Sequence, residues 1–174
     1  GLMESVKTHM QALEKKTGKG FGSGTNPLLV SVRSGSSMSM PGMMDTILNL
    51  GLNETSLKGL IKQTGNERFA YDTYRRFIQL FGKIALNISD EHFNERMAAI
   101  KRKYGAPQDL DLNVDHLKEL VGEFLAIVQK HTGKPFPQDP YEQLEISIGA
   151  VFGSWMGKRA VDYRKQFKIT KDQA

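Results

Sequence analysis

Arg33 is the residue of this sequence best suited to bind a phosphorylated ligand. It ends the run Leu-Leu-Val-Ser-Val-Arg at residues 28–33, which follows Pro27 and predicts a short strand. A guanidinium group is always charged, and its planar set of N–H donors can hold two phosphate oxygens at once. At the end of a strand, this side chain can project into a cleft that the next residues cover. We therefore expect Arg33 to contact phosphate.

The eleven residues at 34–44 contain only Ser, Gly, Met and one Pro, which predicts a long loop directly after Arg33. Serine hydroxyls and uncovered backbone amides can donate hydrogen bonds to phosphate oxygens. Gly42 has no Cβ, so the main chain there can approach a ligand closely. Methionine side chains are flexible, and they can pack on an adenine ring or exclude water from phosphates. The methionines concerned are Met38, Met40, Met43 and Met44.

The same stretch also fits a surface loop that binds nothing, beside an Arg33 that pairs with a nearby carboxylate. Neither a Walker-type Gly-x-x-x-x-Gly-Lys-Ser/Thr pattern nor a Gly-x-Gly-x-x-Gly pattern occurs in the sequence. The residues alone leave both interpretations open.

Few elements are available to position Arg33. A second short strand is expected at 45–50, closed by Gly51, so that strand, loop and strand follow one another. Before them, apolar spacing predicts an amphipathic helix over 2–16. The alternating glycines of 18–24 predict a flexible connection; they are not expected to form a phosphate cradle, because no Lys-Ser/Thr follows them. Two short strands alone make an incomplete sheet.

Helical periodicity dominates the remaining chain, interrupted by three prolines between Gly133 and Pro140. Expected helices span 53–62, 66–86, 89–104 and 114–131, and a last helix runs from Tyr141 toward Arg164 or Phe167. The predicted fold class is therefore α+β and predominantly helical, with a helical insertion on a small mixed base.

Composition excludes several classes of protein. The 174 residues are 39% hydrophobic and 25% charged, which is enough for a packed core. The absence of cysteine excludes a cysteine nucleophile, a thiolate metal site and a disulfide framework. No apolar run is long enough to span a bilayer, and we expect neither a membrane protein nor an exported one. The net charge of +5 suits an anionic ligand, nucleic acid or plain solubility equally well.

Other residues that could do chemistry have simpler explanations. The basic run 101–103 ends a predicted helix, where cations complement the helix dipole, so nucleic-acid binding is not expected. Glu142 and Glu145 lie on a solvated helix face. Four aromatic residues at helical spacing indicate core packing in preference to base stacking, and they are Tyr71, Tyr74, Phe77 and Phe81. Four histidines show no metal-ligand spacing, and they are His9, His92, His116 and His131.

Several strings together resemble the pyruvate phosphate dikinases. Residues 27–35 read PLLVSVRSG, and residues 39–51 read SMPGMMDTILNLG. Residues 65–72 read GNERFAYD, and they are followed by YRRF at 74–77. Trp155 and the segment 158–164 are similar to a later helix of that family. The resemblance covers essentially the whole chain, and the PGMMDT string separates it from the related phosphoenolpyruvate synthases.

The resemblance implies a piece of an ATP-grasp domain. By it, Arg33 is the catalytic arginine that contacts the ATP phosphates, and Gly42 is the loop glycine whose backbone touches the nucleotide. The implied neighbours of the nucleotide in the same loop are Met40, Met43, Met44 and Asp45. The implied division is a partial ATP-grasp subdomain at 1–52, a helical insertion at 53–137, and a long helix at 138–174 that returns to the first part.

The family interconverts ATP, phosphate and pyruvate with AMP, diphosphate and phosphoenolpyruvate through a phosphohistidine. The implied cofactors are ATP and Mg²⁺, yet the family's ATP-site lysine, its acidic metal ligands and its phosphohistidine motif have no counterpart here. We therefore expect an internal segment that is inactive alone and has no metal ligand of its own. Its implied partners are the phosphohistidine domain of the same parent chain and a second subunit of a homodimer, in the cytoplasm. The alternative is a helical interface module that binds no nucleotide.

Overall fold

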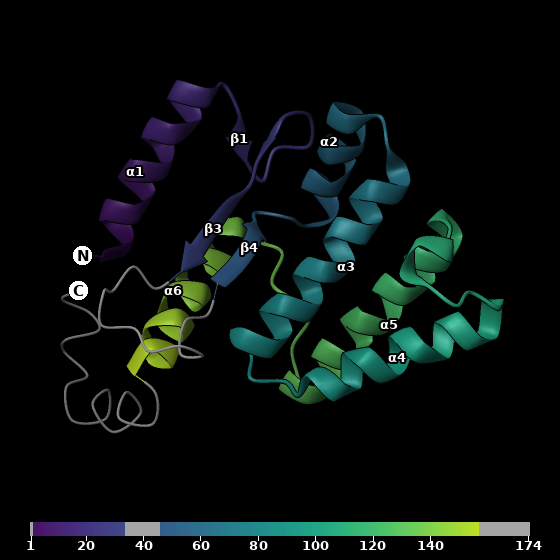
Figure 1. Cartoon of the computed structure of the whole chain (residues 1–174). Helices are drawn as coiled ribbons and strands as arrows, with labels where there is room; N and C mark the ends of the chain where they lie inside the picture. The colour runs from purple at the N-terminus through teal and green to yellow at the C-terminus, as the bar shows by residue number, and fades with distance from the viewer. Residues whose placement is uncertain (1, 34–45, 157–174) are drawn as a thin grey trace.

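Helices make up most of the described backbone, and the strands are short (Figure 1). A computed structural model describes residues 2–33 and 46–156 of the chain. The elements in chain order are α1 Leu2–Thr17, β1 Gly20–Phe21, β2 Pro27–Leu28, β3 Val30–Arg33, β4 Thr46–Leu50, α2 Glu54–Thr64, α3 Glu67–Ile84, α4 Asp90–Tyr104, the 3₁₀ turn η1 Asp109–Asp111, α5 Val114–Thr132 and α6 Pro140–Met156. The expected α+β class, with helices predominating, is confirmed.

The strands form two separate pairs within the described residues. β1 and β2 are parallel, with Gly20 opposite Pro27, whereas β3 and β4 are antiparallel. The prediction of one strand over 28–33 was therefore wrong, because the chain leaves the first pair at Leu29 and enters the second at Val30. No residue type within 28–33 marks a break, and only the position of the partner strands decides where one strand ends.

The prediction of a flexible connection at 18–24 was also wrong. Gly18 does end α1 with a positive φ of 70°, but β1 follows almost at once. Phe21 lies edge-on to the ring of Tyr141 on α6, with 5.1 Å between ring centroids, and its amide donates a 2.9 Å hydrogen bond to Glu14 Oε2. These contacts order a glycine-rich segment whose local composition favours no regular structure.

The helices begin and end at residues suited to those positions. Asparagine side chains accept a backbone hydrogen bond at the start of α2, α3 and α5, and they are Asn53, Asn66 and Asn113. Glycines with left-handed backbone angles follow α2, α4 and α5, at Gly65, Gly105 and Gly133. The helix expected from Tyr141 begins one residue earlier, and its expected continuation through 157–174 lies outside the described residues.

The aromatic face of α3 lies in the core. Tyr74, Phe77 and Phe81 are each 1% exposed or less, which confirms the packing interpretation. Phe77 and Phe81 both pack edge-on against Phe136, at 5.6 and 5.3 Å between ring centroids. Phe136 belongs to the proline-containing segment that leads to α6, so this contact joins the helical part to the end that carries the strands.

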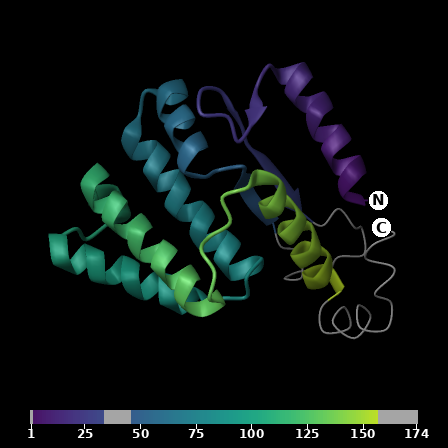
Figure 2. The same cartoon turned by 180° about the vertical axis from the view of Figure 1, so that it is seen from behind.

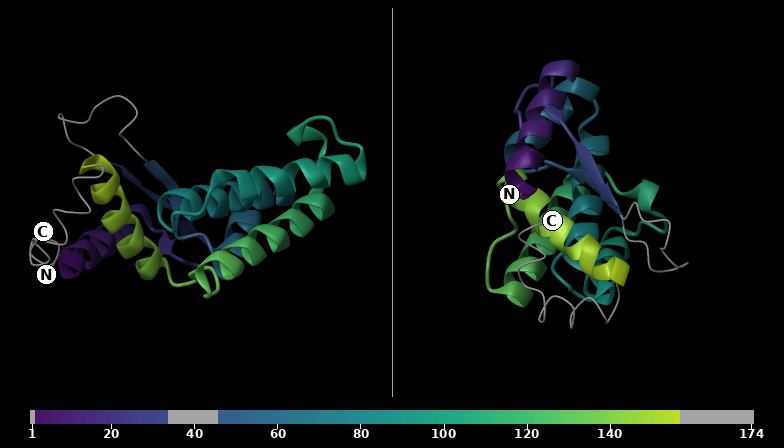
Figure 3. Two further views of the ribbon diagram at one scale, coloured as in Figure 1. Left: turned by 90° about the horizontal axis from the view of Figure 1, so that it is seen from below. Right: turned by 90° about the vertical axis from the view of Figure 1, so that its left-hand side faces the viewer.

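α3 connects the strands to the other helices, since it contacts β4 and also packs along α5. Figure 2 shows α6 and α1 on the strand-bearing side, and α4 and α5 on the opposite side. Figure 3 shows α4 and α5 running side by side away from the strands. Within the described ranges, none of the helices has the length and hydropathy needed to cross a membrane.

Candidate nucleotide-facing site

Arg33 ends β3 on the outward face of the β3–β4 ribbon. Exposure alternates along β3: Val30 and Val32 are half-buried, whereas Ser31 and Arg33 are exposed. Successive strand residues point to opposite faces, so Ser31 and Arg33 share the outer face. Arg33 is paired in register with Thr46, which places residues 33 and 46 side by side at the end of the ribbon. The two described residues that bracket 34–45 are thus brought together.

The other candidate residues are not described by the structure. Residues 34–45 lie outside the described ranges, and with them the predicted contacts at Gly42, Met40, Met43, Met44 and Asp45. Of the predicted site residues, the structure therefore places Arg33 alone. Met38 and the serines of the same stretch are also outside those ranges.

No ion pair links Arg33 to a carboxylate of residues 2–33 or 46–156. Other arginines have structural roles. Arg75 is buried and pairs with Asp72 at 2.8 Å, and Arg68 donates to the backbone oxygens of Leu112 and Asp109 at 2.7 and 2.9 Å. The guanidinium of Arg33 is therefore exposed without a carboxylate partner in this part of the chain.

A bulge in β4 sets the register at this end of the ribbon. Val30 lies opposite Leu50 and Val32 lies opposite Ile47, so three residues of β4 span the distance of two residues of β3. Asn49 absorbs the extra residue with a φ of 65°, a left-handed conformation that asparagine tolerates better than most residues. The bulge leaves Ile47 and Leu50 fully buried, and Leu48 faces outward at 49% exposure.

Gln143 ties the end of β4 to α6. Its Oε1 accepts from the amide of Gly51 at 3.0 Å, and its Nε2 donates to the carbonyls of Leu52 and Pro137 at 2.8 and 2.7 Å. Gln143 is fully buried, so these three bonds satisfy polar groups that water does not reach. Gly51 itself has a φ of 108°, and its Cα lies against the Phe21 ring, where a Cβ would approach within 2.9 Å.

Asn53 forms a second junction beside Gln143. Its Oδ1 caps α2 by accepting from the amide of Ser56 at 2.7 Å, and its Nδ2 donates to the carbonyl of Gln138 at 2.7 Å. Ser56 Oγ in turn donates to the carbonyl of Gly51 at 2.7 Å. Together these bonds hold β4, the start of α2 and the segment before α6 as one unit, which positions the ribbon that carries Arg33.

Sequence reasoning missed Gln143 and Ser147. Both are polar residues at 0% exposure, one turn apart on α6, and Ser147 Oγ has no hydrogen-bond partner among the described residues. The sequence does contain a signal that these two polar residues are buried. Gln143 and Ser147 are spaced at intervals of four residues from the apolar Val151, which places all three on the buried face of α6.

Most of the other residues considered for chemistry have a structural role or lie on the surface. In the basic run at the end of α4, Lys101 pairs with Asp109, and Lys103 pairs with Glu119 at 2.9 Å. Glu142 and Glu145 are both exposed, as expected for a solvated face. Among residues 2–33 and 46–156, no three His, Asp or Glu side chains gather as a metal site. The fold does, however, bring His92 and His131 together, with 4.2 Å between ring centroids, although they are far apart in the sequence.

Comparison with known proteins shows the family of this chain. The family model described as "Pyruvate phosphate dikinase, AMP/ATP-binding domain" matches residues 1–174. This chain belongs to that family. The resemblance seen in the motif strings is confirmed.

Among similar proteins, the family member of Entamoeba histolytica, named "Pyruvate, phosphate dikinase", is 60% identical over 174 residues, which are 100% of this chain and 20% of the relative. That of Giardia intestinalis, with the same name, is 54% identical over 169 residues, or 97% of this chain and 19% of the relative. A Zea mays protein named "Pyruvate, phosphate dikinase 1, chloroplastic" is 45% identical over 170 residues, or 98% and 18%. The chain thus spans about a fifth of the length of these relatives.

Proposed function

We propose that this chain forms part of the ATP site of a pyruvate phosphate dikinase, in which Arg33 contacts the ATP phosphates. The observation that supports the proposal is the position of Arg33. This residue is exposed at the end of β3, directly before residues 34–45 in the chain, and it has no carboxylate partner within the described ranges. The family is an AMP/ATP-binding domain, which supplies the anion that such a guanidinium suits.

The proposed chemistry is positioning and charge neutralisation. Phosphoryl transfer depends mainly on holding the phosphates in line and stabilising the charge that develops on their oxygens. Arg33 serves both needs, with the backbone at Gly42 approaching the nucleotide. The proposed neighbours of the nucleotide are Met40, Met43, Met44 and Asp45. The junctions at Gln143 and Asn53 support this role, because they fix the ribbon from which Arg33 projects.

The proposed fold is part of an ATP-grasp domain. In it, 1–52 is a partial ATP-grasp subdomain, 53–137 is a helical insertion, and 138–174 returns to the first part. Two observations support this division: the strands occur only before residue 51 in the described backbone, and α6 contacts both β3 and β4.

The whole reaction belongs to the longer parent protein. In our proposal the parent interconverts ATP, phosphate and pyruvate with AMP, diphosphate and phosphoenolpyruvate, and a phosphohistidine domain of the same chain receives the phosphoryl group. Magnesium would supply charge neutralisation on the ATP oxygens. We propose that its ligands lie in other parts of the parent chain, as the resemblance implies. A homodimeric parent and a cytoplasmic location remain predictions, and the names of the plant relatives include chloroplastic forms.

Replacement of Arg33 in the full-length enzyme tests the proposal. We expect Arg33→Ala to reduce phosphorylation of the catalytic histidine by ATP about 100- to 1000-fold, the usual effect of removing one charge-stabilising donor. Phosphorylation of the same histidine by phosphoenolpyruvate should be unchanged. Arg102→Ala is the matched control, since Arg102 is also exposed and has no ion pair within the described ranges. A near-normal rate with ATP in Arg33→Ala would refute the role.

Calorimetry with MgATP on the 174-residue chain compares this proposal with an interface module: measurable binding would favour a preformed phosphate site, and its absence would favour the interface module. With most of the cleft supplied by other parts of the parent, we expect weak or no binding of MgATP to the isolated chain. Any heat of binding should vanish in Arg33→Ala. Binding that persists in Arg33→Ala would place the nucleotide elsewhere on the chain.

A further inference from the structure

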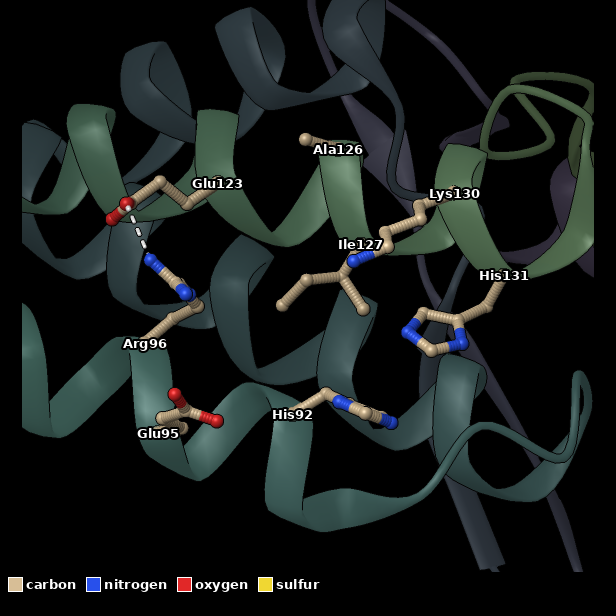
Figure 4. A pocket seen from close by; sticks show the side chains of 8 residues that line it. All are labelled: His92, Glu95, Arg96, Glu123, Ala126, Ile127, Lys130 and His131. Carbon is tan, nitrogen blue, oxygen red and sulfur yellow. Dashed lines mark ion pairs between the residues drawn. The ribbon is translucent and has the colours of Figure 1, made fainter.

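A cleft of about 400 Å³ lies between the first half of α4 and the last half of α5 (Figure 4). His92, Glu95 and Arg96 line it from α4, and α5 contributes the rest of its lining, including Glu123, Lys130 and His131. The volume is in the usual range for small-molecule sites. None of these side chains takes part in the junctions that hold the β3–β4 ribbon.

Nitrogen donors gather at one end of this cleft. The rings of His92 and His131 are 4.2 Å apart between centroids and inclined by 39°, and Figure 4 shows them turned toward each other with the amine of Lys130 on the same side. Neither imidazole nor the Lys130 amine has a hydrogen bond or ion pair with another described residue. An ammonium group offers three N–H donors and an imidazole offers at least one when uncharged, so this end is rich in unused donors.

The opposite end holds a loose ion pair. Arg96 Nη1 lies 3.8 Å from Glu123 Oε1, which is too long for a hydrogen bond, and the buried Glu123 Oε2 has no donor among the described residues. The guanidinium of Arg96 thus retains donors that are not used by Glu123 and that can turn toward a ligand between the helices.

The fixed charges of the lining balance: Arg96 and Lys130 are positive, and Glu95 and Glu123 are negative. Glu123 pairs with Arg96, whereas Lys130 lies on the side of the two imidazoles, so that end of the cleft is the one suited to an anion.

Two contacting imidazoles could also bind a transition metal, but a stable site needs further ligands. In residues 2–33 and 46–156, no third His, Asp or Glu completes such a set. An oxyanion needs no fixed coordination geometry, and it can accept from Lys130 and from both imidazoles together.

We infer that this cleft binds a phosphoryl group, either as free phosphate or on a small phosphomonoester. A phosphoryl group has enough acceptor oxygens for donors that reach it from two helices. Ile127 and Ala126 also line the cleft and supply an apolar surface for the organic part of an ester. Its lining comes from α4 and α5 alone and includes none of the residues proposed for the ATP site.

Histidine NMR on the 174-residue chain tests this inference. The chain has four histidines, so the Cε1–H signals of His9 and His116 serve as internal controls for His92 and His131. Titration with inorganic phosphate should shift the His92 and His131 signals with a dissociation constant in the millimolar range. A tighter constant with glycerol 3-phosphate would identify the ester as the ligand, and an equal or weaker one would identify free phosphate.

Two variants on different helices locate the site. We expect Lys130→Gln and His92→Gln each to weaken phosphate binding about tenfold, because each loses a donor to a charged group. Lys134→Gln is the control, since Lys134 is exposed just beyond α5 and does not line the cleft. Circular dichroism checks that each variant is folded.

Three results would overturn the inference. Phosphate could leave all four histidine signals in place, it could shift those of His9 and His116 equally, or Zn²⁺ could bind at micromolar concentration while phosphate has no effect. The last result would make the paired imidazoles a metal site.

Discussion

Gln143 on α6 accepts a 3.0 Å hydrogen bond from the amide of Gly51, a residue 92 positions earlier in the chain. The Nε2 of the same side chain donates hydrogen bonds to two carbonyl oxygens, those of Leu52 and Pro137. One buried amide thus joins the end of β4 to the segment that precedes α6. The ribbon that carries Arg33 depends on this junction for its position.

Replacement of Gln143 should destabilise the fold. Gln143→Ala leaves one buried N–H and two carbonyls without partners, and we expect the free energy of unfolding to fall by about 3 kcal/mol. Urea denaturation followed by circular dichroism measures this. The matched control is Gln129→Ala, whose side chain is exposed on α5 and makes no hydrogen bond within the described ranges, with an expected change below about 0.5 kcal/mol. Equal effects of the two changes would contradict the role of Gln143.

Asn53 should matter more than an ordinary helix cap. Asn66 caps α3 through one exposed hydrogen bond, and Asn66→Ala should cost about 1 kcal/mol. Asn53 is buried and also donates to the carbonyl of Gln138, so Asn53→Ala should cost about 2 kcal/mol. Unfolding of both variants in urea gives the comparison, and a smaller loss at Asn53 than at Asn66 would count against the junction.

Replacement of two helical glycines by alanine should change the stability of the fold in opposite directions. A Cβ at Gly59 on α2 would approach the backbone of Ser23 and Gly24 and the ring of Pro27 to 2.9 Å, so Gly59→Ala should destabilise the fold by about 2 kcal/mol. A Cβ at Gly122 on α5 would meet nothing within 4 Å, so Gly122→Ala should stabilise it by about 1 kcal/mol. Thermal and urea unfolding test both signs, and stabilisation at Gly59 would show that α2 does not pack as described.

The carboxylate of Asp109 should make the free energy of unfolding depend on pH in the acid range. The Lys101 ammonium, followed by Arg75, lowers the pKa of this carboxyl below its ordinary value. A lowered folded-state pKa contributes stability above the unfolded pKa, and this contribution is lost as the pH falls through the folded pKa. Because the side chain is 47% exposed, we expect Asp109→Asn to cost only about 0.5–1 kcal/mol at pH 7.

Urea unfolding of this variant as a function of pH checks the sign. The difference between the wild type and Asp109→Asn should shrink as the pH falls from about 5 to about 2. Glu145→Gln is the control, since Glu145 is exposed and has no ion pair within the described ranges. A difference that stays constant across this range would mean that the charge of Asp109 has no part in its effect.

Local signals predicted the helices well and the strands less well. The caps at Asn53 and Asn66 and the apolar face of α3 are properties of nearby residues, so they could be identified from the sequence. The β1–β2 pair could not, because a strand of two residues exists only where a partner and an aromatic contact hold it, as Phe21 and Tyr141 do. The turn η1 was missed for a similar reason: Arg68 holds it through two backbone carbonyls.

By itself, the sequence determined the family, the helical character and the identity of Arg33 as the residue to test, since these depend on residue types and short spacings. Only the tertiary structure decided that Arg33 stands opposite Thr46 without a carboxylate partner in the described ranges, that Gln143 holds the ribbon, and that His92 meets His131. Each of these three facts joins residues distant in the chain or depends on what is absent around a side chain. Such relationships arise when elements pack, and no local pattern of residues encodes them.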